Sequence, residues 1–393
     1  MPYNLALAGF ASLLAALVYT YLGYPALLLI FAKIEGIGPR RGNLVERRKD
    51  PARQRPLVTI IIPAYNEQAN IRAKLENVLS LHYPKLEVIV VSDASTDKTD
   101  DIVREFAGKG VLLLRLEKRG GKVSGYRKAV ARAQGHILVF SDATSQLEKD
   151  SLEILLSNFY DPTIGCVAGR LFFVADHTNV SSIGKGEEAY WNYNILINAA
   201  EAHLASLTSV SGAFFAVRKH LFPENLPVHL AEDFIVPLNV VRQGYRTILE
   251  PRAICREVAV HAETQEIRKR ARITLQNIRG LLYGCDLLNV FRYGTFSLLL
   301  ISHKALRLLT PLMLLGLFIA NIVLLPSSIL FAALLVAQLM FYSLGILSGW
   351  LGTHRPRLLN AVHFFCLSNY AIFLGILMFL GRTGSATWET ERI

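Results

Sequence analysis

The sequence has few cysteines, and none of them lies in a pattern that would bind a metal or build a disulfide framework. Cysteine occurs only at positions 166, 255, 285 and 366 of the 393 residues, without a CxxC spacing. Structural zinc sites and disulfide scaffolds need closely spaced or numerous cysteines, so we expect neither. Cys166 and Cys255 are typical of a reducing, cytoplasmic compartment.

Other absences exclude whole classes of protein. The GxxxxGK[ST] spacing of a P-loop is missing, and no internal repeat or low-complexity stretch occurs. Without interleaved aromatic and basic motifs, the net charge of +11 does not predict a nucleic-acid partner. Such charge is instead typical of cytoplasmic loops facing anionic lipid. The hydrophobic segments show no inverted repeat, which disfavours a transporter.

The chain is rich in apolar residues, and their excess lies at its two ends. Hydrophobic residues make up 52% of the sequence, with a mean hydropathy of +0.34. Leu5 to Phe31 is long enough to cross a bilayer, too long for a signal-peptide core and preceded by no basic residue. We therefore predict a transmembrane helix over residues 1–32. The lysine- and arginine-rich linker 33–56 should be cytoplasmic by the positive-inside rule.

The C-terminal part predicts more membrane helices. Residues 263–307 hold two basic amphipathic stretches, Gln265 to Leu288 and Phe296 to Leu306, which are typical of helices in the membrane interface. Transmembrane helices are expected over residues 308–381, before a tail at 382–393. Their apolar segments are Leu308 to Leu325, Ile329 to Leu351 and Leu358 to Leu380.

Residues 57–262 have ordinary globular composition and alternate between strand and helix patterns. Short apolar strands separated by amphipathic helices predict a parallel sheet covered on both faces. In the first half the expected strands are Leu57 to Ile62, Leu86 to Ser92, Val111 to Leu116 and Ile137 to Phe140. The second half is less regular, with a long helix over Gly186 to Ser206 and strands over Gly165 to Val174, Ser211 to Val217 and Arg246 to Glu250.

Three of these strands end in polar turns, where open α/β sheets bind their ligands. The turns hold Pro63-Ala-Tyr-Asn-Glu67, Asp93 and Asp142. A carboxylate at a strand tip can hold a divalent cation against a phosphate, because hard cations prefer oxygen ligands. Either aspartate could equally cap the turn or helix that follows it.

Two further motifs could carry chemistry. Gly120-Gly121-Lys122 opens a basic helix, where the backbone can approach a phosphate closely and the helix N-terminus favours anions. Glu232-Asp233 opens another predicted helix, and a carboxylate there can serve as a general base or simply stabilise the helix dipole.

Taken in order, these motifs resemble the family 2 inverting glycosyltransferases with a GT-A fold. The resemblance runs from about Leu57 to Arg279 and is greatest to the membrane-embedded branch related to bacterial polysaccharide, hyaluronan, chitin and cellulose synthases. It is carried by PAYNE (63–67), VSDASTDKT (91–99), GGK (120–122), FSDAT (140–144), SGAFFAVRK (211–219), AEDF (231–234) and RKRAR (268–272).

The resemblance implies an α/β GT-A domain, a Rossmann-like binder of nucleotide sugars, in the cytosol, joined to transmembrane and interfacial α-helices. It also implies a multi-pass protein of the bacterial inner membrane. The residues that match donor-binding positions of the family are Pro63, Ala64, Tyr65, Glu67, Asp93, Lys122, Asp142 and Arg272. Asp93 is expected at the uracil edge, and Asp142 is the first aspartate of a DxD motif that binds the diphosphate with Mg²⁺ or Mn²⁺.

The same resemblance assigns the acceptor side. Ser211, Gly212 and Ala213 match a loop beside the acceptor, and Trp191 with Tyr190 could form an aromatic platform for it. Asp233 matches the catalytic base, with Glu232 as its neighbour.

Two departures from the family pattern matter. Thr144 stands where the DxD motif has its last aspartate, so a metal would depend on Asp142, the diphosphate and some further ligand, for which His261 is a candidate. Of the QxxRW motif of polymerising synthases only Arg272 is present. The missing tryptophan would stack on the acceptor sugar, so its absence weakens a processive interpretation.

We therefore expect a membrane-bound glycosyltransferase that moves a sugar, from a UDP-sugar, to a lipid-linked or growing glycan in cell-envelope polysaccharide synthesis. Alternatives are a processive synthase that secretes its polymer and could act as a homo-oligomer, a degenerate nucleotide-binding membrane protein without transferase activity, and a nucleotidyltransferase.

Overall fold

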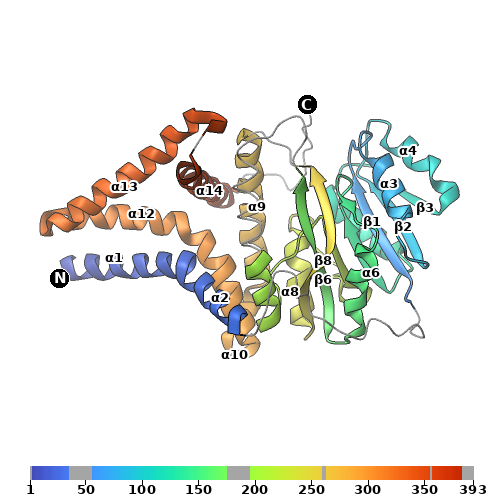
Figure 1. Cartoon of the computed structure of the whole chain (residues 1–393), viewed down its shortest axis with the longest axis horizontal. Helices are drawn as coiled ribbons and strands as arrows, with labels where there is room; N and C mark the ends of the chain where they lie inside the picture. The colour runs from blue at the N-terminus through green and yellow to red at the C-terminus, as the bar shows by residue number, and fades with distance from the viewer. Residues whose placement is uncertain (1, 35–54, 175–194, 259–262, 355, 383–393) are drawn as a thin grey trace.

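The computed structural model describes residues 2–34, 55–174, 195–258, 263–354 and 356–382. An α/β domain lies on one side of the long helix α9 (Glu263–Tyr283), and a group of long apolar helices lies on the other (Figure 1). Four residues or segments discussed above, Tyr190, Trp191, His261 and most of the basic linker, fall outside the described residues.

The first half of the sheet is parallel, as the sequence predicts. Its strands are β1 (Val58–Ala64), β2 (Leu86–Ser92), β3 (Val111–Arg115) and β4 (Ile137–Ser141). They lie in the order β3-β2-β1-β4, and each neighbouring pair is parallel. The carboxyl ends of β1, β2 and β4 consequently meet at one edge, the edge at which a ligand was predicted.

The second half of the sheet is mixed, which corrects the expectation of a purely parallel sheet. The further strands are β5 (Gln146–Leu147), β6 (Ile164–Val174), β7 (Phe214–Arg218) and β8 (Arg246–Val258). β7 runs antiparallel to both β4 and β6, whereas β6 and β8 are parallel. β8 is also longer than the predicted strand, because it continues past Glu250 to Val258.

Side chains alternate between the two faces of the sheet, so each strand contributes to two hydrophobic cores. In β1, Ile60 packs in one core and Ile61 in the other. The first core is covered by α3 (Ile71–Leu79), α4 (Thr99–Glu105) and α6 (Ser151–Leu156). The second is covered by α5 (Gly121–Arg132) and α8 (Glu232–Arg242). Burial on both faces explains why the strands are almost wholly apolar.

Among the described residues, four stretches are long and apolar enough to cross a membrane: Tyr3–Ile34, Thr295–Ser327, Ile329–Leu351 and Leu358–Leu380. The first joins α1 (Pro2–Val18) to α2 (Tyr24–Ile34) through a π-helical turn, Tyr19–Gly23. The last two contain α13 (Ile329–Leu347) and α14 (Arg357–Leu380). Ser328 caps α13 by accepting a hydrogen bond from the Leu330 amide at 3.2 Å.

The stretch Thr295–Ser327 differs from the sequence-based expectation. The segment Phe296 to Leu306, expected to lie in the interface, instead forms α11 (Thr295–Leu300) and the π-helical turn Ile301–Ala305, which lead without a break into α12 (Leu306–Leu324). The short helix α10 (Val290–Tyr293) precedes it. The other expected segment forms the helix α9, which ends at Tyr283 and not at Leu288, and its place in the membrane interface stays a prediction.

Glycines allow α9 to pack closely on both sides. A Cβ on Gly280 would lie 2.5 Å from Cδ1 of Phe234, a ring of α8. On the membrane side, a Cβ on Gly375 of α14 would lie 2.6 Å from Cβ of Thr274 in α9. α9 is therefore one of the elements through which the membrane helices contact the α/β domain (Figure 1).

We predict that Gly280→Ala destabilises the protein, because the added methyl group overlaps the Phe234 ring. Overpacking of this kind typically costs ~1–3 kcal/mol. Thermal unfolding in detergent should show a lower midpoint for Gly280→Ala. Gly9→Ala, a change in α1 where nothing lies within 4 Å of the new Cβ, is the matched control and should leave the midpoint unchanged or higher. Equal midpoints for Gly280→Ala and wild type would contradict the close packing of α8 and α9.

Candidate active site

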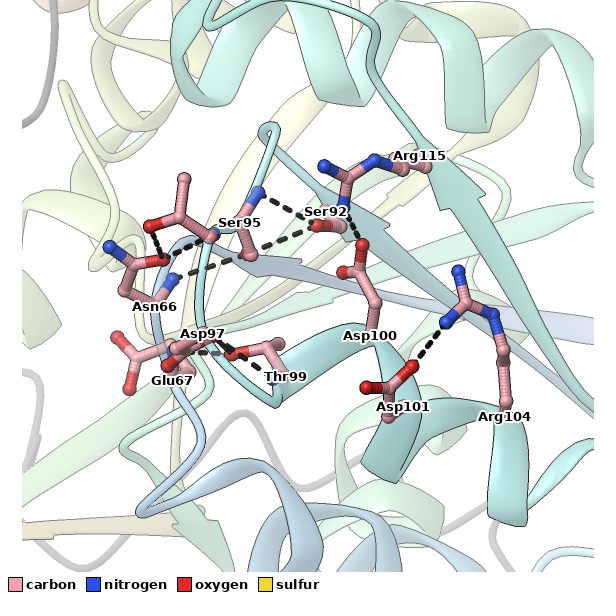
Figure 2. Close-up of polar contacts among 11 residues, drawn as sticks. Asn66, Glu67, Ser92, Ser95, Asp97, Thr99, Asp100, Asp101, Arg104 and Arg115 are labelled. Atoms are coloured by element: carbon pink, nitrogen blue, oxygen red, sulfur yellow. Dashed lines mark hydrogen bonds and ion pairs between the residues drawn. The ribbon is translucent and has the colours of Figure 1, made fainter.

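The turns that follow β1 and β2 are held together by hydrogen bonds, as Figure 2 shows. The Asn66 amide donates to Ser95 Oγ at 3.2 Å, and the Glu67 amide donates to Thr99 Oγ1 at 2.8 Å. Asn66 and Ala94 adopt the left-handed backbone, with φ of 53° and 56°. Such conformations cost ~1–3 kcal/mol and persist only where the surroundings fix them. The two turns thus form one fixed edge at the ends of these strands.

Asp93 fixes the position of the Gly120-Gly121 turn. Its Oδ1 accepts a hydrogen bond from the Gly120 amide at 2.7 Å, and its Oδ2 accepts one from the Gly121 amide at 3.1 Å. Gly121 has a φ of 78°, which glycine adopts without steric cost. The next residue is Lys122, so Asp93 sets where that lysine leaves the turn. Contact between Asp93 and a uracil stays a prediction.

Lys122 joins three elements of the domain. Its Nζ lies 2.9 Å from Asp142 Oδ1, just past β4, and 2.8 Å from Glu232 Oε1, at the start of α8. Burial alone would lower the pKa of Lys122, but the charges of Asp142 and Glu232 raise it well above its ordinary value. The amine therefore stays protonated and remains a fixed cation at this edge of the sheet.

Gly212 brings the loop before β7 against this charged group. A Cβ on Gly212 would lie 3.1 Å from Lys122 Nζ, and 3.6 Å from Asp233 Oδ2 and from Glu232 Oε1. Any larger side chain would fill the space beside these atoms. Next to it, the Ala213 carbonyl accepts from Ser141 Oγ at 3.0 Å, which ties the loop to the end of β4.

Asp233 is the carboxyl group whose acidity is most strongly altered at this edge. Burial, reinforced by the charge of Glu232, raises the pKa of Asp233 to about 7, while Lys122 and Lys304 lower it. A carboxyl with this pKa can both take and release a proton near neutral pH, as a general base requires.

Thr144 is paired with a carboxylate that the sequence did not point to. Its Oγ1 donates a hydrogen bond to Glu257 Oε1 at 2.8 Å. Burial raises the pKa of Glu257, the Thr144 hydroxyl lowers it, and the charge of Asp142 raises it further. These two residues are separated by 113 positions in the chain, and β8 was expected to end at Glu250, so only the full length of that strand reveals the pair.

The oxygen atoms of Asp142, Thr144 and Glu257 suit a hard divalent cation in type, because such ions prefer carboxylate and hydroxyl ligands. Within the described residues, no group of three or more His, Cys, Asp or Glu side chains could hold a metal ion. A cation at this place would therefore need oxygens from its ligand as well, as expected for a metal bound together with a diphosphate.

A buried lysine supports the loop from beneath. Lys74 is 0% exposed, and its Nζ donates to Ser141 Oγ and to the Ser145 carbonyl, both at 2.7 Å. Burial lowers the pKa of Lys74 to about 8. Lys74 was not predicted as a functional residue from the sequence. Its spacing from Ile71 and Val78 nevertheless places it on the apolar face of α3, where a lysine is unexpected.

The remaining predicted residues have more varied surroundings. Pro63 and Ala64 are buried at the end of β1, and the Arg119 guanidinium lies 3.8 Å from the centre of the Tyr65 ring beyond them. Glu67 is 1% exposed and accepts a hydrogen bond from Asn70 Nδ2 at 2.9 Å, so it supports the turn from within.

The roles predicted for Arg272, Trp191 and Ser211 are not tested by the contacts of this group. Arg272 lies in α9, and Trp191 lies outside the described residues. Ser211 lies in the loop before β7, where its Oγ accepts a hydrogen bond from the Ala213 amide at 3.4 Å. Their expected roles toward donor and acceptor stay predictions.

Comparison with known proteins agrees with this architecture. Residues 59–225 match the family model of glycosyl transferase family 2. "Probable glycosyltransferase YdaM" of Bacillus subtilis (strain 168) is 29% identical over 223 residues, which is 53% of this chain and 52% of that protein. "Poly-beta-1,6-N-acetyl-D-glucosamine synthase" of Staphylococcus aureus (strain COL) is 27% identical over 210 residues, 50% of this chain and 49% of that protein. The chain thus spans about half the length of the curated relatives it matches.

A solved structure shows the same fold over nearly the whole chain. It is the mannosyltransferase PcManGT from Pyrobaculum calidifontis, in complex with GDP-Man and Mn²⁺. The similarity covers 96% of this chain and 100% of that one, with a TM-score of 0.68 and 24% sequence identity. The expected GT-A fold is confirmed.

We predict that Lys74→Met destabilises the loop after β4, because Ser141 and Ser145 lose a buried charged donor. Leaving buried polar atoms without their partner costs ~1–3 kcal/mol. The free energy of unfolding, from denaturant titration in detergent, should fall by this amount. Lys149→Met, at an exposed position, is the control and should have little effect. If both variants unfold alike, Lys74 does not support the loop.

Proposed function

We propose that this chain, whose residues 59–225 match the family model of glycosyl transferase family 2, is a membrane-bound glycosyltransferase. It would move a sugar from a nucleotide sugar to an acceptor hydroxyl with inversion. The main support for the proposal is the cluster of charged side chains at the carboxyl edge of the sheet. There Lys122 contacts Asp142 and Glu232, and Asp233 lies beside them across Gly212.

On the donor side, the fixed charges suit a diphosphate leaving group. Lys122 is a permanent cation at the end of β4, and Asp142, Thr144 and Glu257 would hold a divalent cation, Mg²⁺ or Mn²⁺, next to it. Such an ion, when bound, would neutralise charge on the departing diphosphate. We propose a UDP-sugar as donor. A GDP-sugar is the alternative, because the solved mannosyltransferase of the same fold is in complex with GDP-Man and Mn²⁺.

On the acceptor side, Asp233 takes the proton from the attacking hydroxyl. The raised pKa of Asp233, about 7, gives its carboxylate the basicity for this step, while Glu232 is kept in place by its ion pair with Lys122. Attack from the side opposite the leaving group inverts the anomeric carbon. Ser211, Gly212 and Ala213 then border the acceptor.

We propose a lipid-linked or growing glycan of the cell envelope as the acceptor, with the catalytic domain on the cytoplasmic side of a bacterial inner membrane. The four candidate spans and the basic linker support this placement. Similarity to a poly-N-acetylglucosamine synthase keeps processive synthesis as a second candidate. Against it, the chain has Arg272 but neither the Gln nor the Trp of the QxxRW motif.

The proposal is tested by nucleotide release from the purified chain in detergent, with a panel of UDP- and GDP-sugars and Mg²⁺ or Mn²⁺. We expect release with one donor and loss of release with EDTA. Tight nucleotide binding without release from any donor, in the presence of membrane lipid extract as the acceptor source, would favour a degenerate binding protein.

We predict that the rate of sugar transfer rises with pH to a plateau, with its midpoint near the pKa of Asp233, about 7. Only the deprotonated carboxylate can accept the proton, so activity is lost as the pH falls through this value. Asp233→Asn should lower kcat by at least ~100-fold, the usual scale for a general base. Asp101→Asn, at an exposed helix position paired with Arg104, is the control.

Stability should change in the opposite direction to activity. A carboxyl whose pKa is raised on folding binds its proton more tightly in the native state, so stability falls as the pH rises from about 4 to 7. An Asp233→Asn variant that keeps full activity, or a wild-type profile that is flat between pH 5 and 8, would remove Asp233 from the mechanism.

We predict that Glu257→Gln weakens metal binding. The change removes a carboxylate charge beside Thr144 while keeping the shape of the side chain. Titration of Mn²⁺ into the nucleotide-bound protein, followed by electron paramagnetic resonance, should show affinity lower by roughly 10- to 100-fold. Glu148→Gln is the control, because it removes the charge of the ion-pair partner of Arg256, the residue that precedes Glu257 on β8. Thr144→Asp combined with Glu257→Gln should restore binding. Unchanged affinity in the single variant would exclude Glu257 as a ligand.

A further inference from the structure

A π-helical turn interrupts the first long helix after the catalytic domain. It spans Ile301–Ala305, between α11 and α12, inside the candidate span Thr295–Ser327. Single π-helical turns inside α-helices are rare and occur frequently at functional sites. The extra residue of such a turn changes the directions in which neighbouring side chains leave the helix.

Three successive side chains of this turn contact three different elements. Ser302 Oγ lies 2.8 Å from Tyr19 Oη, which belongs to the π-helical turn of the N-terminal helix. His303 Nδ1 lies 2.6 Å from Oε1 of Glu201, in the helix over residues 195–204. Lys304 Nζ lies 5.4 Å from the ring centre of Phe234, the residue that follows Asp233. The turn is therefore the place where the membrane helices meet the catalytic edge.

Lys304 lies near two carboxyl groups, those of Asp233 and Glu201, which partly compensate its charge. Lys304 is close enough to Asp233 to lower the pKa of that carboxyl, yet among the described residues no carboxylate forms an ion pair with it. Arg307, one turn further along the helix, likewise has no ion pair to a described residue, and its buried Nε lacks a hydrogen-bond partner. His303 differs, because it is paired with Glu201.

Cations inside an apolar membrane segment are costly, and they are usually paired or functional. Asp233 and Glu201 lie near Lys304 but form no ion pair with it within the described part of the chain, so a negatively charged ligand could form one. Lys122 reaches the Asp142–Asp233 region from α5 of the catalytic domain, whereas Lys304 reaches it from the membrane helix. Lys304 belongs to the candidate span Thr295–Ser327, so a ligand anchored in the bilayer would lie beside the element that carries it.

We propose that Lys304 and Arg307 bind the phosphate of a lipid-linked acceptor, and so hold its hydroxyl at Asp233. The inference rests on the proposed function and makes it more specific. The acceptor would be an isoprenoid lipid carrying a phosphate or diphosphate, with only a short sugar part between phosphate and attacking hydroxyl. A long polysaccharide acceptor would place no phosphate here.

The test is a binding measurement on the full chain in phosphatidylcholine nanodiscs, with polyprenyl phosphate as the probe and polyprenol as its uncharged counterpart. Native mass spectrometry reports how much of each lipid is retained. We expect Lys304→Met to lower the affinity for polyprenyl phosphate by at least roughly 10-fold, because a charge-assisted contact is lost. The affinity for polyprenol should stay unchanged. Lys304→Arg, which keeps the charge, should retain most of the affinity.

A matched control and a competitor complete the design. Arg292→Met removes an exposed cation of α10, stacked 5.2 Å from the centre of the Tyr293 ring, and should not affect binding. Unchanged binding in Lys304→Met, or an equal loss in Arg292→Met, would overturn the proposal. Phosphatidylglycerol competing as well as polyprenyl phosphate would also overturn it, since Lys304 would then contact bulk anionic lipid. This experiment measures lipid binding and not sugar transfer. A negative result in the transferase assay would therefore not decide whether Lys304 binds the lipid phosphate.

Discussion

The catalytic edge of this protein depends on the two ion pairs of Lys122. Its Nζ lies within 2.9 Å of Asp142 and 2.8 Å of Glu232, and these residues come from helix α5, the end of β4 and the start of α8. Removing one partner of a buried pair typically costs several kcal/mol, because the remaining charge is left without compensation. The two pairs thus fix three elements at once, and with them the distance between the strands proposed to bind the donor and the helix that carries Asp233.

The balance of charge around Lys122 also determines what the site can bind. Asp142, Glu232 and Asp233 bring more negative charge than one lysine can neutralise. The pKa of Asp233 rises to about 7 as a consequence of burial and of the charge of Glu232. The same excess of carboxylates would repel a diphosphate, unless further cations are close. Lys74 beneath the loop and a divalent cation at Asp142 and Glu257 are two sources from the catalytic domain.

Much of the fold could be predicted from the sequence, because its signals are local. The apolar strands, the amphipathic helices and the membrane segments each show in a window of a dozen residues, and Val88 and Ile89 already illustrate the alternation between two cores. The antiparallel β7 could not be predicted in this way, since a short apolar strand has the same pattern in either direction. The π-helical turns were equally invisible, because Tyr19 and Lys304 lie in uniformly helical sequence.

The candidate site was predictable where a strand end, a helix start or a family motif points to a residue. Lys122, Asp142 and Glu232 were expected to lie near one another, and the structure brings them into contact. Glu257 was not expected, because its partner Thr144 is 113 residues away and only the pairing of β8 with its neighbours aligns the two. A threonine at the motif position removes a carboxylate from the loop, and a glutamate on an adjacent strand returns one to nearly the same place. Loss of the motif aspartate therefore does not by itself remove the negative charge that a metal ion would need. A carboxylate from any strand that borders the site can supply that charge, and here Glu257 lies beside Thr144.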